Sequence, residues 1–271
     1  MSRKPESLIT HIELTQPRLT NRRLAEYMAA SPIRKRTLIR NTKYRKADPE
    51  VSYAEGFAVI GDMLADGDLV TTRLSDAAED FHDRMDVDGY FDRLRIDLTG
   101  DMFDWLADHR TPLKLPDADR FDDSRTWGRG GSWSVEGVTL DPEIYLRLSR
   151  LRRGFKTVGA ATLRYSKSGA LKPAKSDIGV ADWQSALIHG YLTDTITDDT
   201  LRPDPALCLT LDLRAGHAHP APGNSVTLMQ HIAATCASIS ERWPNIPPPD
   251  NAIIGTAADI PAPRPEPSIP F

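Results

Sequence analysis

Apolar residues recur at helical spacing through most of the first 110 positions. Leu24, Tyr27 and Met28 fall on one face of a segment spanning 21–30, and Thr20 precedes it as a preferred N-cap residue. Three longer stripes follow, the first after Asp48-Pro49-Glu50, which resembles a helix start. Their positions are Tyr53, Phe57, Ile60 and Leu64; Leu74, Ala78, Phe81 and Met85; and Phe91, Leu94, Leu98, Met102, Trp105 and Leu106. We therefore expect residues 1–110 to form a helical bundle with acidic exposed faces.

The middle of the chain lacks a clear period. Residues 111–135 are rich in proline, aspartate and glycine, and they predict a long loop or interdomain connection. A helix start is then expected at Asp141-Pro142-Glu143, with Ile144, Leu148 and Leu151 on one face and an end near Gly154.

The pattern changes in the segment 136–243, for which we predict a small α+β domain ordered strand–helix–strand–strand–helix. A strand is expected over 156–165 and a helix over 178–196. Residues 207–213 alternate leucine with Cys208, Thr210 and Asp212, which is typical of a half-buried strand with one apolar face. Ala215-Gly216 predicts a tight turn into a short return strand, and Met229, Ile232, Cys236, Ile239 and Trp243 mark a final amphipathic helix.

The last segment, 244–271, holds 9 prolines in 28 residues. This composition predicts a polyproline II or disordered tail, which either stays passive or docks into an aromatic groove of a partner. The overall prediction is an α+β protein made of a helical domain (1–110), a connection (111–135), a small α+β domain (136–243) and this tail.

Composition narrows the class of protein. No apolar run approaches 18 residues, which excludes a membrane-spanning helix, and the first residues lack the apolar core of a secretory signal. Two cysteines exclude a disulfide framework and a zinc ribbon, so a reduced, cytoplasmic environment is expected. Arginine outnumbers lysine 25 to 9, a bias that favours a bacterial source with a GC-rich genome.

The net charge of −4 hides a strong segregation of charge along the chain. Residues 1–47 carry 12 basic and 3 acidic side chains, and 124–175 carry 11 and 3. The acidic blocks are 48–123, with 7 basic and 21 acidic side chains, and 176–271, with 4 and 11. Such blocks predict either pairing between segments or separate basic and acidic surfaces.

The sequence SPIRKRTLIRNTKYRK, residues 31–46, holds seven lysines and arginines and no acid. Ser31 followed by Pro32 is a preferred start for a helix, so we expect a second helix here. Cations in this density indicate contact with nucleic-acid phosphates, and a second basic segment lies near residue 150. The candidate residues are Arg34, Lys35, Arg36, Arg40, Lys43, Arg45, Lys46, Arg150, Arg152, Arg153 and Lys156. Internal pairing with the acids of 48–123 is the competing interpretation, since it would mask these charges.

Linear motifs of catalysis are absent. The chain has no phosphate-binding glycine loop, nucleophile elbow, zinc-protease motif or C-x-x-C, so no cofactor is expected. DVDGYFD at 86–92 resembles part of a calcium loop, but Arg84 and Arg95 would occupy two essential ligand positions. An acidic helix start near Asp88 explains this stretch better. Cys236 lies on the apolar stripe of its predicted helix, which favours a core residue over a nucleophile, and Cys208 has no basic helper visible in the sequence.

The predicted hairpin supplies the best candidate for metal chemistry. A two-residue turn at Ala215-Gly216 would pair Asp212 with His219 and place His217 on the same face. Two imidazoles and one carboxylate leave a catalytic zinc one strong ligand short, so a structural role is favoured for Asp212, His217 and His219.

The leading functional hypothesis is a non-catalytic accessory protein that binds DNA or RNA electrostatically and acts with a partner protein. The alternative is a protein–protein adaptor that uses the acidic bundle and the proline-rich tail without nucleic acid. A metal-dependent hydrolase built on the hairpin histidines is the third hypothesis.

Overall fold

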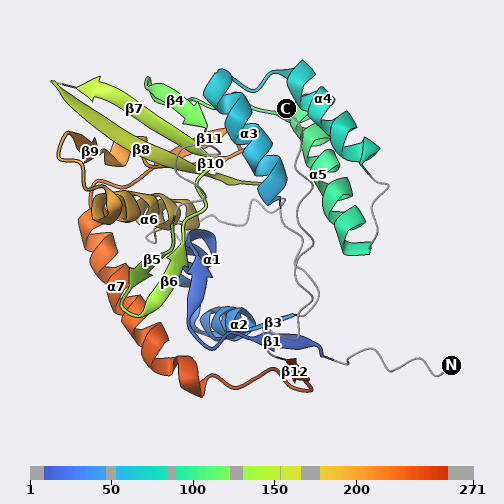
Figure 1. Cartoon of the computed structure of the whole chain (residues 1–271), viewed down its shortest axis with the longest axis vertical. Coiled ribbons are helices and arrows are strands. Elements are labelled where there is room, and N and C mark those ends of the chain that lie inside the picture. The colour runs from blue at the N-terminus through green and yellow to red at the C-terminus, as the bar shows by residue number, and fades with distance from the viewer. Residues whose placement is uncertain are drawn as a thin grey trace.

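A mixed β-sheet lies at the centre of the molecule, with helices against both of its faces (Figure 1). The computed structural model of the chain describes residues 9–46, 53–84, 90–122, 131–152, 154–165 and 178–255. The architecture is mixed α and β, in agreement with the predicted class.

The central sheet has the strand order β11-β10-β8-β7-β4, with β9 paired to β8. The strands are β4 (Asp119–Asp122), β7 (Leu146–Arg152), β8 (Phe155–Arg164), β9 (Leu201–Pro203), β10 (Leu209–Asp212) and β11 (His217–Pro220). β10 runs parallel to β8, whereas β7 and β11 are antiparallel to their neighbours. The connection between β8 and β10 passes through a helix, as a parallel pair requires.

Three helices cover one face of this sheet: α3 (Ala54–Asp66), α4 (Thr71–Asp83) and α5 (Tyr90–His109). Their apolar stripes meet the leucines of β7 and β10 in one buried cluster that includes Phe57, Phe103 and Leu211. The leucines at 207, 209, 211 and 213 all belong to this cluster, because alternate side chains of a strand point to the same face.

The second face is covered by α6 (Val180–Thr195), which joins a separate buried cluster. This cluster also contains α1 (Asn21–Met28), α7 (Ser225–Arg242) and the hairpin β5 (Trp133–Val135) and β6 (Val138–Asp141). The short strand β2 (Arg18–Thr20) pairs with β6 and leads directly into α1. The Trp133 indole donates to the Asp194 carboxylate at 3.1 Å, which ties the hairpin to α6.

A small three-stranded sheet completes the fold at the end of the molecule where α7 terminates (Figure 1). It consists of β1 (His11–Glu13), β3 (Tyr44–Lys46) and β12 (Ile254–Gly255). The helix α2 (Pro32–Lys43) runs straight into β3, and a short 3₁₀ helix, η2 (Trp243–Asn245), follows α7; a second one, η1 (Pro205–Leu207), precedes β10. Segments from both ends of the sequence therefore build this region together.

Several predicted elements are confirmed with their boundaries. The N-caps are among them: the hydroxyl of Thr20 accepts from the Arg23 N–H, and that of Ser31 accepts from the Arg34 N–H. Four later elements also agree with the prediction. β8 is the strand expected over 156–165, α6 is the helix expected over 178–196, β11 is the return strand at 217, and α7 is the last helix.

Two predictions in the middle of the chain are wrong. The segment 111–135 is not a featureless connection, because it contributes β4 and β5. The segment expected to be a helix after Asp141 is an extended stretch that continues into the strand β7, and Ile144, Leu146 and Leu148 are buried at every second position along it. Residues 144 and 148 alone fit both periods, and it is Leu146 between them that distinguishes the strand.

The predicted N-terminal bundle is not confirmed. α1 packs on α6 in one cluster and α3–α5 pack on the sheet in the other, so each core combines residues from before 110 with residues after 135. The predicted tail is not confirmed either: residues 244–255 include η2 and β12, and β12 pairs with β1. The remainder of that segment, 256–271, lies outside the described residues, as do Asp48-Pro49-Glu50 and the helix start predicted near Asp88. Within the part of the chain that the structure describes, no helix is long and apolar enough to span a membrane.

Gly159 in β8 provides a test of the sheet packing. A Cβ at this position would overlap the carbonyl oxygen and Cβ of Leu207, both held in place by η1. Gly159→Ala is therefore expected to lower the free energy of unfolding by about 2 kcal/mol, or the Tm by roughly 6 °C, through overpacking. Gly223→Ala is the matched control, since a Cβ there meets nothing within 4 Å. Equal melting temperatures for the two variants would contradict this packing.

Candidate nucleic-acid interface

The helix α2 carries most of the basic residues singled out in the sequence. Ser31 caps it, Pro32 occupies its first turn, and the hydroxyls of Thr37 and Thr42 donate to the carbonyls four residues earlier. Because a helix distributes consecutive side chains over its whole circumference, the seven cations of 31–46 divide into three groups with different surroundings. Arg34 and the β3 residues Arg45 and Lys46 are exposed, Lys35, Arg36 and Arg40 face a groove, and Lys43 is buried.

Lys43 is a structural residue, which corrects its assignment as a phosphate contact. Its side chain is only 4% exposed, and its ammonium donates to the carbonyl oxygens of Trp243 at 2.9 Å, Ile246 at 3.3 Å and Pro244 at 3.4 Å. The Glu13 carboxylate lies 3.3 Å from the same nitrogen. The ammonium therefore satisfies carbonyls at the C-terminal end of α7, where the helix dipole favours a cation.

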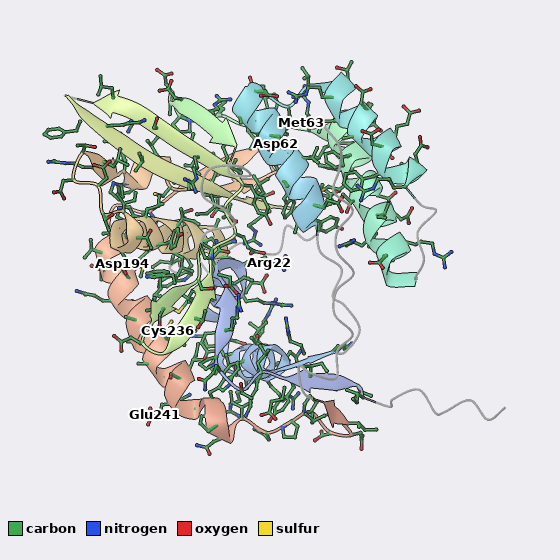
Figure 2. The ribbon with its side chains drawn as sticks, viewed as in Figure 1. Arg22, Asp62, Met63, Asp194, Cys236 and Glu241 are labelled. Carbon is green, nitrogen blue, oxygen red and sulfur yellow. The ribbon has the colours of Figure 1, made fainter. Side chains whose placement is uncertain are left out.

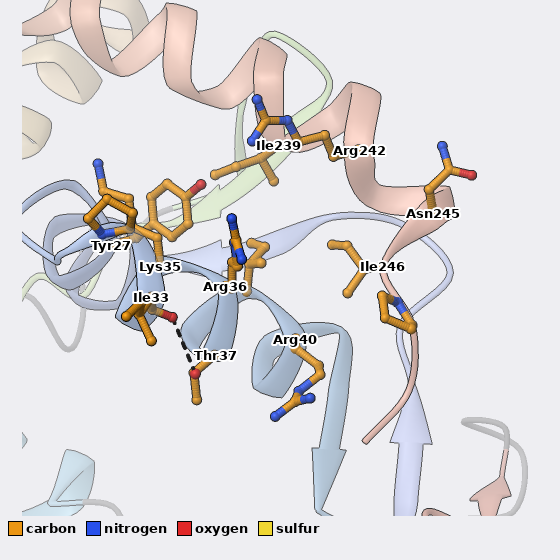
Figure 3. Close-up of a pocket in the computed structure, with 13 residues that line it drawn as sticks. Tyr27, Ile33, Lys35, Arg36, Thr37, Arg40, Ile239, Arg242, Asn245 and Ile246 are labelled. Carbon is orange, nitrogen blue, oxygen red and sulfur yellow. Dashed lines mark hydrogen bonds between the residues drawn. The ribbon is translucent and has the colours of Figure 1, made fainter. Parts of the chain in front are cut away.

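A groove of about 740 Å³ separates α2 from the C-terminal end of α7 (Figure 3). Its cationic lining is Lys35, Arg36 and Arg40 from α2 and Arg242 from α7, and none of the described residues that line it is an acid. Its apolar lining is Tyr27, Pro32, Ile33, Ile39, Ile239, Ile246 and Pro247, and Thr37 and Asn245 complete the wall. In Figure 3, Arg36 projects from α2 toward α7, and Arg242 stands on the opposite side of the opening.

The cations of α2 are not masked by carboxylates within the described residues. Lys43 alone among the seven basic residues of 31–46 forms an ion pair there. Several acids of 48–123 pair with arginines of their own region instead: Asp66 with Arg73, Glu55 with Arg84, and Asp68 with Arg120. The nearest acid in sequence to Arg242 is Glu241, which lies near the end of α7 on the side turned away from α2 (Figure 2).

Lys35 and Arg40 differ in their local partners. The Lys35 ammonium lies 5.4 Å from the centroid of the Tyr27 ring, which is a cation–π contact between α2 and α1. The Nε of Arg40 is buried and has no hydrogen-bond acceptor among the described residues. A buried donor without an acceptor is costly.

The second basic segment is separate from the first. Its residues sit around the tip of the β7–β8 hairpin, at the opposite end of the molecule from α2 (Figure 1). Lys156 is exposed, whereas Arg150 forms a 2.7 Å ion pair with Asp204. Arg152 ends β7, and Arg153 lies outside the described residues. The two basic segments therefore do not form one continuous footprint.

The hairpin register differs from the one predicted. The turn between β10 and β11 has four residues rather than two, so Asp212 pairs with His217, and Thr210 pairs with His219. Asp212 Oδ1 accepts from the N–H groups of Arg214 and Ala215 and thereby closes the turn. The ligand atoms of Asp212, His217 and His219 do not gather within 4.8 Å of one another.

A different trio does gather its ligand atoms within 4.8 Å among the described residues: His82 of α4 with Asp101 and Asp104 of α5. His82 Nε2 already lies 3.0 Å from Asp104 Oδ2, so the arrangement is explained by a helix-to-helix hydrogen bond. Both carboxylates are exposed.

The two cysteines are buried, and burial raises the pKa of each thiol to about 12. Cys208 lies on the sheet face that α6 covers, and Cys236 lies on α7 (Figure 2). A thiol in this state holds its proton at neutral pH, which is unsuitable for a nucleophile.

A cluster of charged groups that the sequence did not indicate lies where β8 and β10 end. Arg164, 8% exposed, donates to Gln184 Oε1 at 3.0 Å and stands opposite Asp212 in the parallel register. Burial lowers the pKa of Arg164, against the opposing influence of Glu26 and Asp212. Burial also raises the pKa of Glu143, although Arg22 and the Thr20 hydroxyl favour its ionised form. No spacing rule connects these residues, because the charged groups come from β8, β10, α1 and the loop before β7.

The α7 side of the groove was likewise missing from the sequence prediction. Arg242, Ile239 and Ile246 lie about 200 residues from α2 in sequence, and only the folded chain brings them together.

No protein-family model matches the chain, and no curated protein sequence matches it.

Lys43 can be tested by comparison with its exposed neighbour Lys46. Lys43→Met is expected to lower the free energy of unfolding by about 2–3 kcal/mol, because the buried carbonyls lose their charged donor. Lys46→Met removes the same charge from the surface of β3 and is expected to change stability by less than about 0.5 kcal/mol. Chemical denaturation of both variants measures the difference. Equal stabilities would contradict a structural role for the Lys43 ammonium.

Glu143 makes a pH-dependent prediction. Because its folded-state pKa is raised, ionisation of Glu143 weakens the fold as pH rises above about 4 and through the folded-state pKa. Glu143→Gln copies the neutral form, so it is expected to raise the Tm by roughly 2 °C at pH 8 and to leave it unchanged at pH 4. Glu136→Gln, an exposed residue between β5 and β6, is the control with no such pH dependence. A lower Tm for Glu143→Gln at pH 8 would show that the carboxylate stabilises the fold.

Proposed function

We propose that the protein binds nucleic acid through the basic surface formed by α2, β3 and the end of α7, as a non-catalytic accessory protein. The observation that carries the proposal is the groove lining, which contains four cations and no acid among the described residues. Arg34 on α2 and Arg45 and Lys46 on β3 are exposed and add to this basic surface. Phosphate contact needs cations that are not paired with carboxylates, and no ion pair of these seven cations occurs among the described residues.

The distribution of acids supports the proposal. Exposed carboxylates lie on α4 and α5, in the upper right of Figure 1 and away from α2, and include Asp76, Glu79, Asp80, Asp101, Asp104 and Asp108. A molecule with a basic end and an acidic end is oriented by the field of a polyanion, so that its basic end arrives first. The same acidic surface is available to a partner protein, which remains a prediction from the sequence.

The second basic segment enters the proposal as a subsidiary contact. Lys156 remains exposed for phosphate, whereas Arg150 is engaged with Asp204. Since the hairpin tip and α2 lie at opposite ends of the molecule, a single short site cannot reach both at once.

A salt titration tests phosphate contact directly. Seven cations of the proposed surface remain once Lys43 is excluded: Arg34, Lys35, Arg36, Arg40, Arg45, Lys46 and Arg242. If each neutralises one phosphate, the log–log slope of affinity against salt is expected to be about −6 for duplex DNA and about −5 for a single strand. The triple variant Arg34→Ala, Arg36→Ala, Arg40→Ala is expected to reduce the magnitude of that slope by about 2–3 and to weaken binding for every sequence.

The matched control removes cations from another surface. Arg93→Ala with Lys114→Ala affects two exposed side chains outside the basic surface and should leave the affinity within about twofold of the parent protein and the slope unchanged. Absence of binding to DNA and RNA at low salt, or an equal effect of the control, would refute the proposal.

A further inference from the structure

The groove between α2 and α7 contains an apolar surface that phosphate contact does not explain. Ile239 at its base is 2% exposed and belongs to the buried cluster around α6 and α7, and Ile39 and Ile246 pack beside it. Ile33 at the edge is 78% exposed, which is unusual for an isoleucine on a basic helix. A cationic surface for phosphates alone needs no such residues.

The charge of the lining restricts what can cover this apolar surface. Among the described residues, four cations surround it without an acid, three on α2 and one on α7. The complementary ligand is therefore apolar at its centre and carries anionic groups on both sides. A nucleotide within a strand has this composition, with one base between two phosphates, and the volume of about 740 Å³ falls in the range of small-molecule sites.

Duplex and single strand differ in whether that base is available. Paired bases are stacked inside a helix and present only their edges, whereas an unpaired base can leave the stack and bind an apolar surface with its face. A duplex on α2 would meet the cations but leave the accessible parts of Ile33, Ile39 and Ile246 against water. The hydrophobic effect consequently favours a single strand in this groove.

We infer that the groove holds an unpaired base of single-stranded nucleic acid, with the flanking phosphates on Lys35, Arg36, Arg40 and Arg242. This rests on the proposed function and specifies its substrate class. The base contacts the accessible parts of Ile39 and Ile246 on the groove floor. The contact is independent of base identity because every base has an apolar face.

The experiment compares three probes of equal length at one salt concentration: a 12-nucleotide oligothymidine, the same strand with abasic sites, and a 12-base-pair duplex. Oligothymidine is expected to bind roughly tenfold more tightly than the other two, as base contacts of this kind require. The abasic strand keeps every phosphate and loses only the bases, so it isolates the contribution of the groove floor without altering the protein.

Two variants locate the contact. Ile246→Ser is expected to weaken oligothymidine binding about tenfold and to leave duplex binding unchanged, since no charge is altered. Ile33→Ser, at the exposed rim, is expected to weaken it about threefold and serves if Ile246→Ser proves unstable. Val226→Ser is the control, a 69% exposed residue at the other end of α7.

The outcomes separate the two proposals. Equal affinity for all three probes, with no effect of either isoleucine variant, overturns single-strand selection while nucleic-acid binding stands. Failure of all three probes to bind at low salt overturns both. A preference for oligothymidine that Ile246→Ser and Ile33→Ser leave intact would place the base elsewhere and also overturn the inference.

Discussion

The burial of β8 and β10 on both faces is the constraint from which the rest of the structure follows. Residues 159–164 of β8 are all buried, and Thr210 of β10 is completely buried. The Thr210 hydroxyl accepts a hydrogen bond from the Ser185 hydroxyl and donates one to the Ala181 carbonyl. Because such strands need cover on each face, the chain must supply two helical layers. α3–α5 provide one and α6 provides the other, and each layer generates its own core.

The groove depends on that arrangement through Lys43. α7 packs on the α6 side of the sheet and ends in carbonyls that the Lys43 ammonium satisfies, and the Tyr44 hydroxyl adds a hydrogen bond to Ile246 at 3.0 Å. The Trp243 indole also donates to the Leu14 carbonyl, so three contacts hold the end of α7 near α2. Lys43 of α2 thus holds the end of α7 in place as the wall of the groove that Lys35, Arg36 and Arg40 line.

Local rules predicted local structure well. Thr20 and Ser31 begin α1 and α2 as expected, since an N-cap depends only on residues within one turn. The errors arose where a period was ambiguous or a turn length was unknown. β7 and the residues before it were predicted as a helix because the buried Ile144 and Leu148 are four apart, and the hairpin register shifted because its turn has four residues. The polar side of the strand at 207–213 was expected to face water, but its Cys208 and Thr210 are covered by α6.

The candidate site likewise combines features that follow from local sequence with features that depend on the fold. The basic helix, its start at Ser31 and Pro32, and its high cation content can be predicted from the sequence, since they depend on neighbours in the chain. The availability of the predicted cations depends on the fold. Lys43 donates to carbonyls at the end of α7, Arg150 of β7 pairs with Asp204, and Lys35, Arg36 and Arg40 line a groove. The opposite wall comes from Ile239, Arg242 and Ile246, about 200 residues away. The burial of Lys43 and the pairing of Arg150 depend on which segments lie close together in space, and those positions follow from the packing of helices on the two faces of β8 and β10.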